Sequence, residues 1–352
     1  MNKKIYEEIR LCPYDIYIWG AGSMAKEIKK RLDEQKINVK GYFIDKKKES
    51  NDPVKDKEIY DEEWILNNRH KIAIVCGHGH YENIIKLQKY DSIKRVFVIA
   101  NPYIQYQGPN EEWLSNNKNK IDAVLKTLDF MSAKCLLAYY KVQKSGDVKD
   151  ILDEDFVMDN IFSFFSSGIT QEEIYVDIGA YTGDTVESFI KACGRKYKKI
   201  IAIEPNLKAY NLLEKYASKQ KNIITKCCGV GKKNEKMYID INDMQSTHAS
   251  RDIVGTAIDI YKLDDILKQE SVTLIKIFVP FMAMDILEGA KESILKFRPK
   301  LIINVGADDG THILDVIEWI YNLSLGYNVF LRYDFPMPTR LAVYAYVELS
   351  GD

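Results

Sequence analysis

Short apolar runs alternate with segments of helical spacing along the first part of the chain. This alternation is typical of a parallel sheet whose strands are joined by helical crossovers. Strands are expected at residues 15–20, 39–45, 71–77 and 95–100, and helices at 23–35 and 80–90. The breakers Gly108 and Pro109 then interrupt the pattern. We therefore expect a small α/β domain over residues 1–110.

The next segment, residues 111–165, carries apolar side chains at helical spacing and few strand signals. It predicts a helical connector that packs on the following domain. A docking element without chemistry of its own is the simplest interpretation.

The alternation returns over residues 166–352 and predicts a larger α/β domain. Strands are expected at 173–180, 199–205, 222–229, 272–279, 300–305, 327–334 and 341–349, and helices at 184–194, 206–219, 284–297 and 312–323. A hairpin at 235–243 and a further strand at 255–263 should lie between the third and fourth strands. Only "FPMPTR" joins the last two strands, which is too short for a parallel crossover, so they should be antiparallel. A doubly wound sheet with that ending is the plan of S-adenosylmethionine-dependent methyltransferases rather than of dinucleotide-binding proteins.

The glycine turn in "IYVDIGAYTGDTVESFI" begins this domain. Asp177 ends the strand, Gly179 and Gly183 allow close approach of the backbone, and Asp184 with Thr185 opens the helix. A pyrophosphate prefers a helix N-terminus without acids. Negative charge there favours a sulfonium with an α-amino group instead. Helix capping explains Asp184 as well, but it does not explain an acid at the end of the strand.

Glu204 lies at the end of the next strand, in "AIEPN". An acid in this position can accept hydrogen bonds from two ribose hydroxyls, in dinucleotide sites and methyl-donor sites alike. The ligand class is therefore decided by the acid-rich turn and the terminal hairpin, and both favour the methyl donor.

A second glycine turn, "GAGSMA", lies near the N-terminus. Gly20, Gly22 and Ser23 follow a strand and open a helix, and Asp45 ends the next strand at the spacing of the Rossmann fingerprint. This Rossmann-like turn could bind a nucleotide or nucleotide sugar, or it could simply pack a helix on a strand. His78, in "CGHGHYEN", could face the same place. No acid or cysteine cluster completes a metal set, so we expect no metal site.

Composition narrows the function classes. The net charge is −1 and the basic residues are scattered, which disfavours a nucleic-acid partner. No run has the length of a membrane span and no signal peptide is evident. The six cysteines form no C-x-x-C pair, and most lie in apolar patterns, as expected of buried thiols in a reducing cytoplasm. We expect a cytoplasmic protein with a small-molecule or glycan acceptor, and a homo-oligomer is left open.

The C-terminal half, from about residue 169 to 349, resembles the FkbM family of methyltransferases. The resemblance depends on "YVDIGAYTGDTVESF", "IAIEPN", "CCGVGKKNEK", "KLDDIL" and "LEGAKESILKFRPKLIINV". It implies a Rossmann-like methyltransferase fold, S-adenosylmethionine as donor, and O-methylation of sugar hydroxyls in glycans or secondary metabolites. The N-terminal domain is similar to the small nucleotide-binding-like module found before some such domains.

The resemblance also implies which residues contact the methyl donor. The turn lines the methionine part, Glu204 binds the ribose, Cys228 and Gly229 border the adenine, and Ser246 lies in a loop that reaches the active site. The full set is Asp177, Gly179, Ala180, Tyr181, Gly183, Asp184, Thr185, Glu204, Pro205, Asn206, Cys228, Gly229 and Ser246.

One departure from the family pattern concerns catalysis. Phe278, Pro280, Phe281 and Ala283 stand where the family has Asp, Glu, Gly and Glu. Methylation of a hydroxyl needs a base, so three hypotheses follow. The base comes from elsewhere, the turn forms an aromatic floor for a different acceptor, or the domain binds the donor without catalysis. The candidate bases are His248, His312, Asp308 and Asp309, and the two aspartates could also bind acceptor hydroxyls. An O-methyltransferase is favoured over a non-catalytic cofactor- or nucleotide-sugar-binding subunit.

Overall fold

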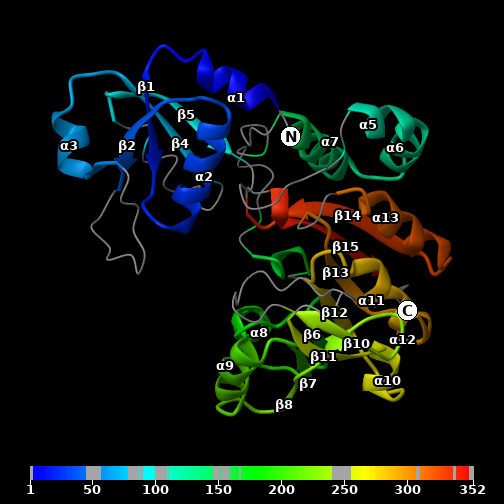
Figure 1. Cartoon of the computed structure of the whole chain (residues 1–352). Coiled ribbons are helices and arrows are strands. Elements are labelled where there is room, and N and C mark those ends of the chain that lie inside the picture. Colours follow the sequence, from blue (N-terminus) through cyan, green and yellow to red (C-terminus); the bar gives the residue numbers. More distant parts are fainter. Residues whose placement is uncertain are drawn as a thin grey trace. The chain divides into compact units, whose positions relative to one another are not determined.

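The computed structural model describes two compact units. The described residues are 3–44, 57–77, 87, 90–99, 109, 111–145, 151, 158, 160–165, 168–239, 255–306, 310–335 and 338–348. Unit 1 comprises Met1–Lys118, Lys134–Phe156 and Pro336–Thr339, and unit 2 comprises Asn119–Ala133, Val157–Phe335 and Arg340–Asp352. Each unit has its own sheet (Figure 1).

Unit 1 contains a five-stranded sheet in the order β3-β2-β1-β4-β5, and all its strand pairs are parallel. The elements are α1 (Lys3–Arg10), β1 (Asp15–Trp19), α2 (Ser23–Glu34), β2 (Val39–Phe43), β3 (Ile59–Tyr60), α3 (Glu62–Asn67), β4 (Ile72–Gly77) and β5 (Ile93–Ile99). The predicted parallel sheet is confirmed. Successive side chains of β1 point to opposite faces of the sheet. Ile16 and Ile18 share one face, where they pack in a core with Ile28 and Leu32 of α2.

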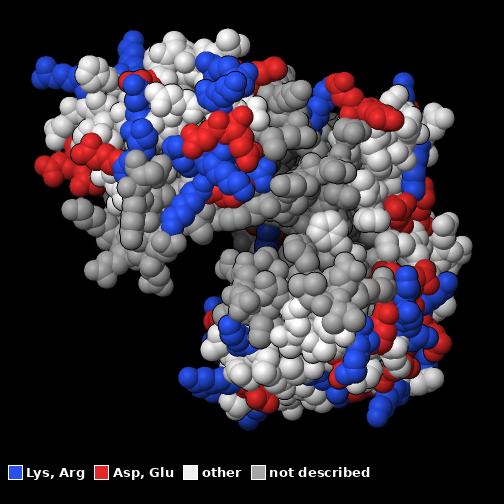
Figure 2. All heavy atoms as spheres, in the orientation of Figure 1, with Lys and Arg blue, Asp and Glu red and all other residues white. Residues whose placement is uncertain are grey.

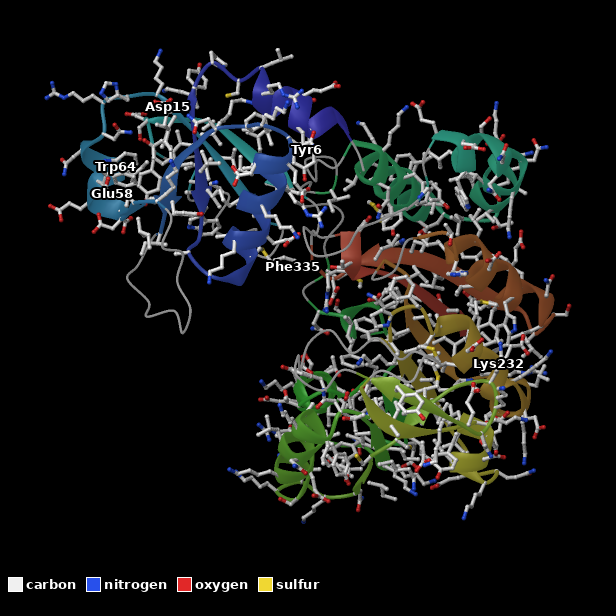
Figure 3. All side chains as sticks on the ribbon, viewed as in Figure 1. Tyr6, Asp15, Glu58, Trp64, Lys232 and Phe335 are labelled. Carbon is white, nitrogen blue, oxygen red and sulfur yellow. The ribbon has the colours of Figure 1, made fainter. Side chains whose placement is uncertain are left out.

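The opposite face of β1 carries an aromatic cluster. Tyr17 lies 5.2 Å from Trp64 between ring centroids, and Tyr60 lies 4.2 Å from Trp64. The hydroxyl of Tyr60 donates to Glu58 at 2.8 Å, and Trp64 and Glu58 mark the cluster in Figure 3. The rings contact one another and pack α3 on the sheet.

Three helices follow unit 1's sheet in the chain: α5 (Glu111–Asn116), α6 (Lys118–Leu125) and α7 (Phe130–Ser145). Within unit 1, Lys144 of α7 pairs with Glu111 of α5 at 2.6 Å. Within unit 2, Lys120 of α6 pairs with Asp315 at 2.6 Å, and Asp129 pairs with Arg332 at 2.7 Å. The helical segment therefore contributes to both units.

Unit 2 contains a seven-stranded sheet in the order β14-β15-β13-β12-β6-β7-β8. The strands are β6 (Ile174–Ile178), β7 (Lys199–Ile203), β8 (Ile223–Lys226), β12 (Leu274–Ile277), β13 (Lys300–Asn304), β14 (Tyr327–Tyr333) and β15 (Leu341–Val347). β15 is antiparallel to both β13 and β14, whereas the other pairs are parallel. The antiparallel ending predicted from the short connection is confirmed.

The helices of unit 2 that follow its strands are α8 (Asp184–Ala192), α9 (Leu207–Ala217), α10 (Leu263–Leu267), α11 (Ala283–Gly289), α12 (Lys291–Phe297) and α13 (Ile313–Asn322). A single helix was expected over 284–297, but Ala290 separates two. The carboxylate of Asp264 accepts hydrogen bonds from the backbone N–H groups of Glu292 and Ser293, at 3.0 and 2.9 Å. It thereby caps α12 as a separate helix.

A second, three-stranded sheet in unit 2 has the order β10-β11-β9. Its strands are β9 (Gly229–Val230), β10 (Glu235–Ile239) and β11 (Thr256–Tyr261). β10 pairs antiparallel with β11. The strand expected at 255–263 is therefore β11, and its partner β10 lies in the segment 235–243, where a hairpin was expected. Lys232, labelled in Figure 3, pairs with Asp285 of α11 at 3.1 Å and so connects the segment between β9 and β10 to that helix.

The surface of the described residues carries both signs of charge. On the face shown in Figure 2, basic and acidic side chains of each unit are interspersed. None of the described helices is both long enough and apolar enough to cross a membrane.

Gly289 of α11 packs directly on the backbone of Gly231, which follows β9. A Cβ at this position would lie 2.0 Å from the carbonyl oxygen of Gly231. We predict that Gly289→Ala lowers the free energy of unfolding by about 1–3 kcal/mol, because the backbone must move apart. Gly168→Ala is the control, since its Cβ would find its nearest neighbours at 3.8 Å. Urea unfolding would measure both, and equal stability of the two variants would contradict the prediction.

Candidate active site

A buried ion pair connects the two central strands of unit 2. Lys276 of β12 lies opposite Asp177 of β6 in the strand register, and its Nζ is 2.7 Å from Asp177 Oδ1. The exposed fractions of the two residues are 1% and 0%. Two charges at this depth are stable only if each is paired and hydrogen-bonded.

The same ammonium group holds the glycine turn that follows β6. Lys276 Nζ donates to the carbonyl oxygen of Gly179 at 2.9 Å and lies 3.2 Å from Thr185 Oγ1. The Thr185 hydroxyl in turn donates to Asp177 Oδ2 at 2.6 Å. Both Asp177 oxygens are thus occupied inside the protein. From the sequence, Asp177 is expected to face the ligand with its charge. In the structure its carboxylate instead contacts Lys276 and Thr185 and so orients the turn.

Lys276 was not singled out from the sequence. The signal was available, since a lysine in the middle of the apolar run "LIKIF" must find a partner when that run becomes a central strand. What the sequence does not give is the register that places it opposite Asp177.

The turn itself needs its glycines. Gly179 has a φ of +78°, and a Cβ there would lie 2.4 Å from the carbonyl oxygen of Phe278. Gly183 has a φ of +94°, and a Cβ there would meet Tyr216 and Leu213 at 3.1 and 3.2 Å. Both residues therefore allow β6, β12 and α9 to approach the turn closely.

The other turn residues lie between these glycines and α8. The N–H groups of Gly179 and Ala180 both donate to the carbonyl oxygen of Ile203, which ties the turn to β7. Tyr181 has a φ of +49°, and Asp184 begins α8 with its side chain exposed. Asp184 is thus the acid of this turn that faces solvent.

Glu204 follows β7 and faces this turn. Its Oε2 accepts the N–H of Tyr181 at 2.9 Å, and its Oε1 accepts the N–H of Asn206 at 2.8 Å. Burial raises the pKa of Glu204, while these two N–H groups and Lys276 act in the opposite direction. Each oxygen keeps a lone pair for a further donor.

Pro205 and Asn206 connect Glu204 to α9. The Oδ1 of Asn206 caps this helix by accepting from Lys208 and Ala209 at 3.0 and 3.4 Å. Its Nδ2 is buried and has no hydrogen-bond partner within the part of the chain that the structure describes. An unsatisfied donor beside Glu204 is what a bound polar ligand would complete.

A cavity of about 410 Å³ lies beyond the end of β8. Its lining consists of Thr225, Lys226, Cys227, Cys228, Tyr261, Asp265, Ile266 and Lys268. Burial raises the pKa of the Cys228 thiol to about 11, so this side chain lines the cavity in its uncharged form. Gly229 begins β9 and packs against Ile260, where a Cβ would lie 2.4 Å from the Ile260 side chain.

The turn after β12 is aromatic. The Phe278 ring lies under two cations, with Lys276 Nζ at 4.7 Å and the guanidinium carbon of Arg340 at 5.4 Å from its centroid. Phe281 has a φ of +61°, although it is a bulky residue, and 47% of its surface is exposed. A left-handed backbone at this position is what a glycine would adopt without strain.

Of the candidate bases, His312 is described. It lies at the start of α13, and its Nδ1 is 3.5 Å from Asp315 Oδ2. About half of its side chain is exposed. His248, Asp308, Asp309 and the loop residue Ser246 lie outside the described residues. Among the residues that are described, no group of three His, Cys, Asp or Glu side chains has a metal-binding arrangement.

The N-terminal glycine turn has the backbone expected of it. Gly20 has a φ of +96° and donates its N–H to the carbonyl oxygen of Phe43 at 2.8 Å, and Gly22 precedes α2 without a side-chain cap. Asp45, His78 and the side chain of Ser23 lie outside the described residues. A second nucleotide site at this turn stays a prediction.

Comparison with known proteins gives the chain a family context. Residues 177–329 match the family model of the methyltransferase FkbM domain. No curated protein matches the sequence significantly.

A solved FkbM methyltransferase shares the fold, and smaller methyltransferases are similar to part of the chain. Methyltransferase FkbM from Methylobacillus flagellatus KT is similar over 98% of this chain and 93% of its own, with 17% identity and a TM-score of 0.70. An rRNA methylase from Streptococcus thermophilus is similar over 53% of this chain and 93% of its own, with 14% identity and a TM-score of 0.35. TrmK of M. capricolum, solved with S-adenosyl-homocysteine, covers 54% of this chain and 71% of its own, with 14% identity and a TM-score of 0.33. The first of these extends over both units.

The ion pair leads to a stability prediction. Lys276→Met leaves the Asp177 carboxylate buried without its counter-charge, and we expect a loss of about 3–5 kcal/mol in the free energy of unfolding. The double variant Lys276→Met/Asp177→Asn should recover part of that loss, because the buried charge is removed with its partner. Urea unfolding of both variants is the measurement. A Lys276→Met protein as stable as the wild type would contradict the prediction.

Proposed function

Since the chain carries a methyltransferase FkbM domain at residues 177–329, the domain of a family of S-adenosylmethionine-dependent methyltransferases, we propose that it methylates a hydroxyl of a small acceptor. The acceptor is a sugar or another small hydroxylated molecule, in glycan or secondary-metabolite biosynthesis. The observation that carries the proposal is Glu204, a buried carboxylate that faces the glycine turn braced by Lys276 and Asp177. O-methylation follows from the resemblance to the family.

The residues present suit the methyl donor. Each oxygen of Glu204 has accepted a single backbone N–H and can accept one ribose hydroxyl. The unpartnered Nδ2 of Asn206 would find an acceptor in the same ligand. Neutral Cys228 would border the adenine, and the backbone of Gly179 to Gly183 would follow the methionine part, with Asp184 near its amino group.

S-adenosylmethionine supplies an activated methyl group on a sulfonium. The chain's contribution is to hold an acceptor oxygen in line with that group and to keep water out, and such positioning supplies a large part of the acceleration. The acceptor would lie on the β12 and β13 side, over Phe278 and Phe281. A base would take the hydroxyl proton, and His312, His248, Asp308 and Asp309 are our candidates.

A binding subunit without catalysis is the second candidate function. The observation that favours it is the turn at residues 278–283, "FVPFMA", which has no ionisable side chain. Such a protein would hold the methyl donor, or a nucleotide sugar at the Gly20 turn, within a glycan-modifying system.

The cysteines suit a reducing compartment. None of the six forms a disulfide, and Cys76, Cys135 and Cys228 are buried. Because disulfides are rare in the cytosol, we place the protein in the cytoplasm.

Titration with S-adenosylhomocysteine tests the donor site. We expect the wild type to bind it in calorimetry, and Glu204→Gln to bind about 10- to 100-fold more weakly, because hydrogen bonds to a charged carboxylate are lost. Glu214→Gln is the matched control, a glutamate on the exposed surface of α9, and should bind as the wild type does. Absence of binding to folded wild-type protein would overturn the methyltransferase proposal.

The raised pKa of Glu204 predicts a pH dependence. Burial makes the free protein take up a proton at a higher pH than an ordinary glutamate does, whereas ribose hydroxyls bind the ionised form. Affinity for S-adenosylhomocysteine should therefore be full at neutral pH and fall on acidification, beginning above the usual glutamate range. A calorimetric series from neutral to mildly acidic pH would measure this. In Glu204→Gln the affinity should not change with pH. A wild-type affinity that is equally independent of pH would contradict the role of Glu204 in binding.

A further inference from the structure

Arg340 lies at the same end of the sheet as the glycine turn. It directly precedes β15, and the Leu341 carbonyl oxygen accepts the N–H groups of Val305 and Gly306 at 2.9 and 3.0 Å, just past the end of β13. Because β15 runs antiparallel to β13, the start of one strand meets the carboxyl end of the other. In open α/β sheets, ligands bind outside the carboxyl ends of the strands. Arg340 is therefore on the ligand-binding edge, on the side away from β7 and β8.

The guanidinium of Arg340 is fixed in orientation. Its Nε donates to Asp334 Oδ1 at 2.9 Å and its Nη2 donates to Asp334 Oδ2, and the Asp334 side chain is 6% exposed. Its central carbon is 5.4 Å from the centroid of the Phe278 ring. Burial acts to lower the pKa of Arg340, but the Asp334 carboxylate outweighs it and raises that pKa, so the group is charged. Because the acid and the aromatic ring already hold the planar guanidinium, it loses little further conformational freedom when a ligand binds.

One edge of this guanidinium is open. Nη1 has no hydrogen-bond partner among the described residues, since the bonds that Arg340 makes come from Nε and Nη2. Of the Arg340 side-chain surface, 36% is exposed, whereas the Asp334 side chain that holds it is buried. Arg340 thus combines a fixed position with an unused donor group.

Among the described residues, Asp334 and Asp184 are the carboxylates that act on the charge of Arg340. The neighbouring turn, residues 278–283, is apolar throughout. Asp177 is neutralised by Lys276, and Asp334 is committed to Arg340 itself. Asp184 acts on Arg340 only through space, and its side chain is exposed to solvent, which screens it.

We propose that Arg340 is a specificity-determining residue that binds a carboxylate or phosphate group of the acceptor through Nη1. The assignment rests on the proposed function, and it narrows the acceptor to a hydroxylated molecule with an acidic group, such as a uronic acid or a sugar phosphate. The Phe278 ring holds the guanidinium plane, and a charge-assisted hydrogen bond from Nη1 fixes the acceptor.

The experiment uses the full chain saturated with S-adenosylhomocysteine. D-glucuronate, D-glucose 6-phosphate and neutral D-glucose are titrated into the wild type and into Arg340→Gln, with binding followed by ligand-observed NMR at constant ionic strength. At least one acid should bind the wild type more tightly than glucose, and Arg340→Gln should lose about 10- to 100-fold of that affinity. Stronger binding of the glucuronate or of the phosphate identifies which acidic group the site prefers.

Two further variants control for charge and for folding. Arg95→Gln removes a comparable arginine of unit 1, which lies 3.5 Å from Glu8 and 4.9 Å from the centre of the Phe97 ring, and it should leave the acid preference unchanged. Arg340→Gln/Asp334→Asn removes both members of the pair, so no buried carboxylate is left alone. It should also lose the preference while still binding S-adenosylhomocysteine.

The outcomes separate this proposal from the proposed function. Failure of the folded wild type to bind S-adenosylhomocysteine would remove both. Normal S-adenosylhomocysteine binding with no preference for either acid over glucose would overturn the Arg340 assignment alone. So would a preference that survives in both Arg340 variants.

Discussion

The ion pair between Lys276 and Asp177 is the interaction on which the C-terminal unit depends. It joins the two central strands, β12 and β6, at the point where the chain order of the sheet reverses. Through Gly179 and Thr185 it also determines the path of the turn between β6 and α8. A buried pair of this kind contributes little net stability relative to an apolar pair, but it is costly to break. Its role is therefore to keep one arrangement of the turn, and in the proposed site this arrangement exists before the ligand binds.

The ion pair divides the carboxyl-terminal edge of the sheet into two sides with different chemistry. On the β7 and β8 side, Glu204 and Asn206 offer hydrogen-bonding groups beside the neutral Cys228. On the other side, Phe278, Phe281 and Arg340 offer rings and a cation. In the proposed site, hydroxyl-rich and apolar parts of a ligand would therefore contact residues of different strands, as expected at a topological switch point. The division agrees with a donor on one side and an acceptor on the other.

The turn after β12 has a backbone conformation that is unusual for its side chains. Phe281 adopts a left-handed conformation at the position where the resemblance to the family implies a glycine, and 47% of its surface is exposed. The cost of this conformation is of the order of 1–3 kcal/mol and is tolerated where the surroundings determine the path of the chain. Here the hydrogen bond from the Phe278 N–H to Ile178 holds the beginning of the turn. The turn thus combines an apolar sequence with a backbone conformation that favours glycine.

The sequence by itself determined the local and periodic features. The alternation of apolar runs predicted the two α/β sheets, the six residues between the last two strands required an antiparallel ending in the second, and the glycines marked the turns. These are set by interactions within a few residues, which the sequence displays directly. Tertiary structure alone decided that Asp177 faces Lys276 rather than solvent, that Asp264 divides one predicted helix into two, and that Arg340 lies over Phe278. Each of these joins residues at least 28 positions apart in the chain, and such pairs depend on strand order and register, which are fixed by the packing of the whole sheet.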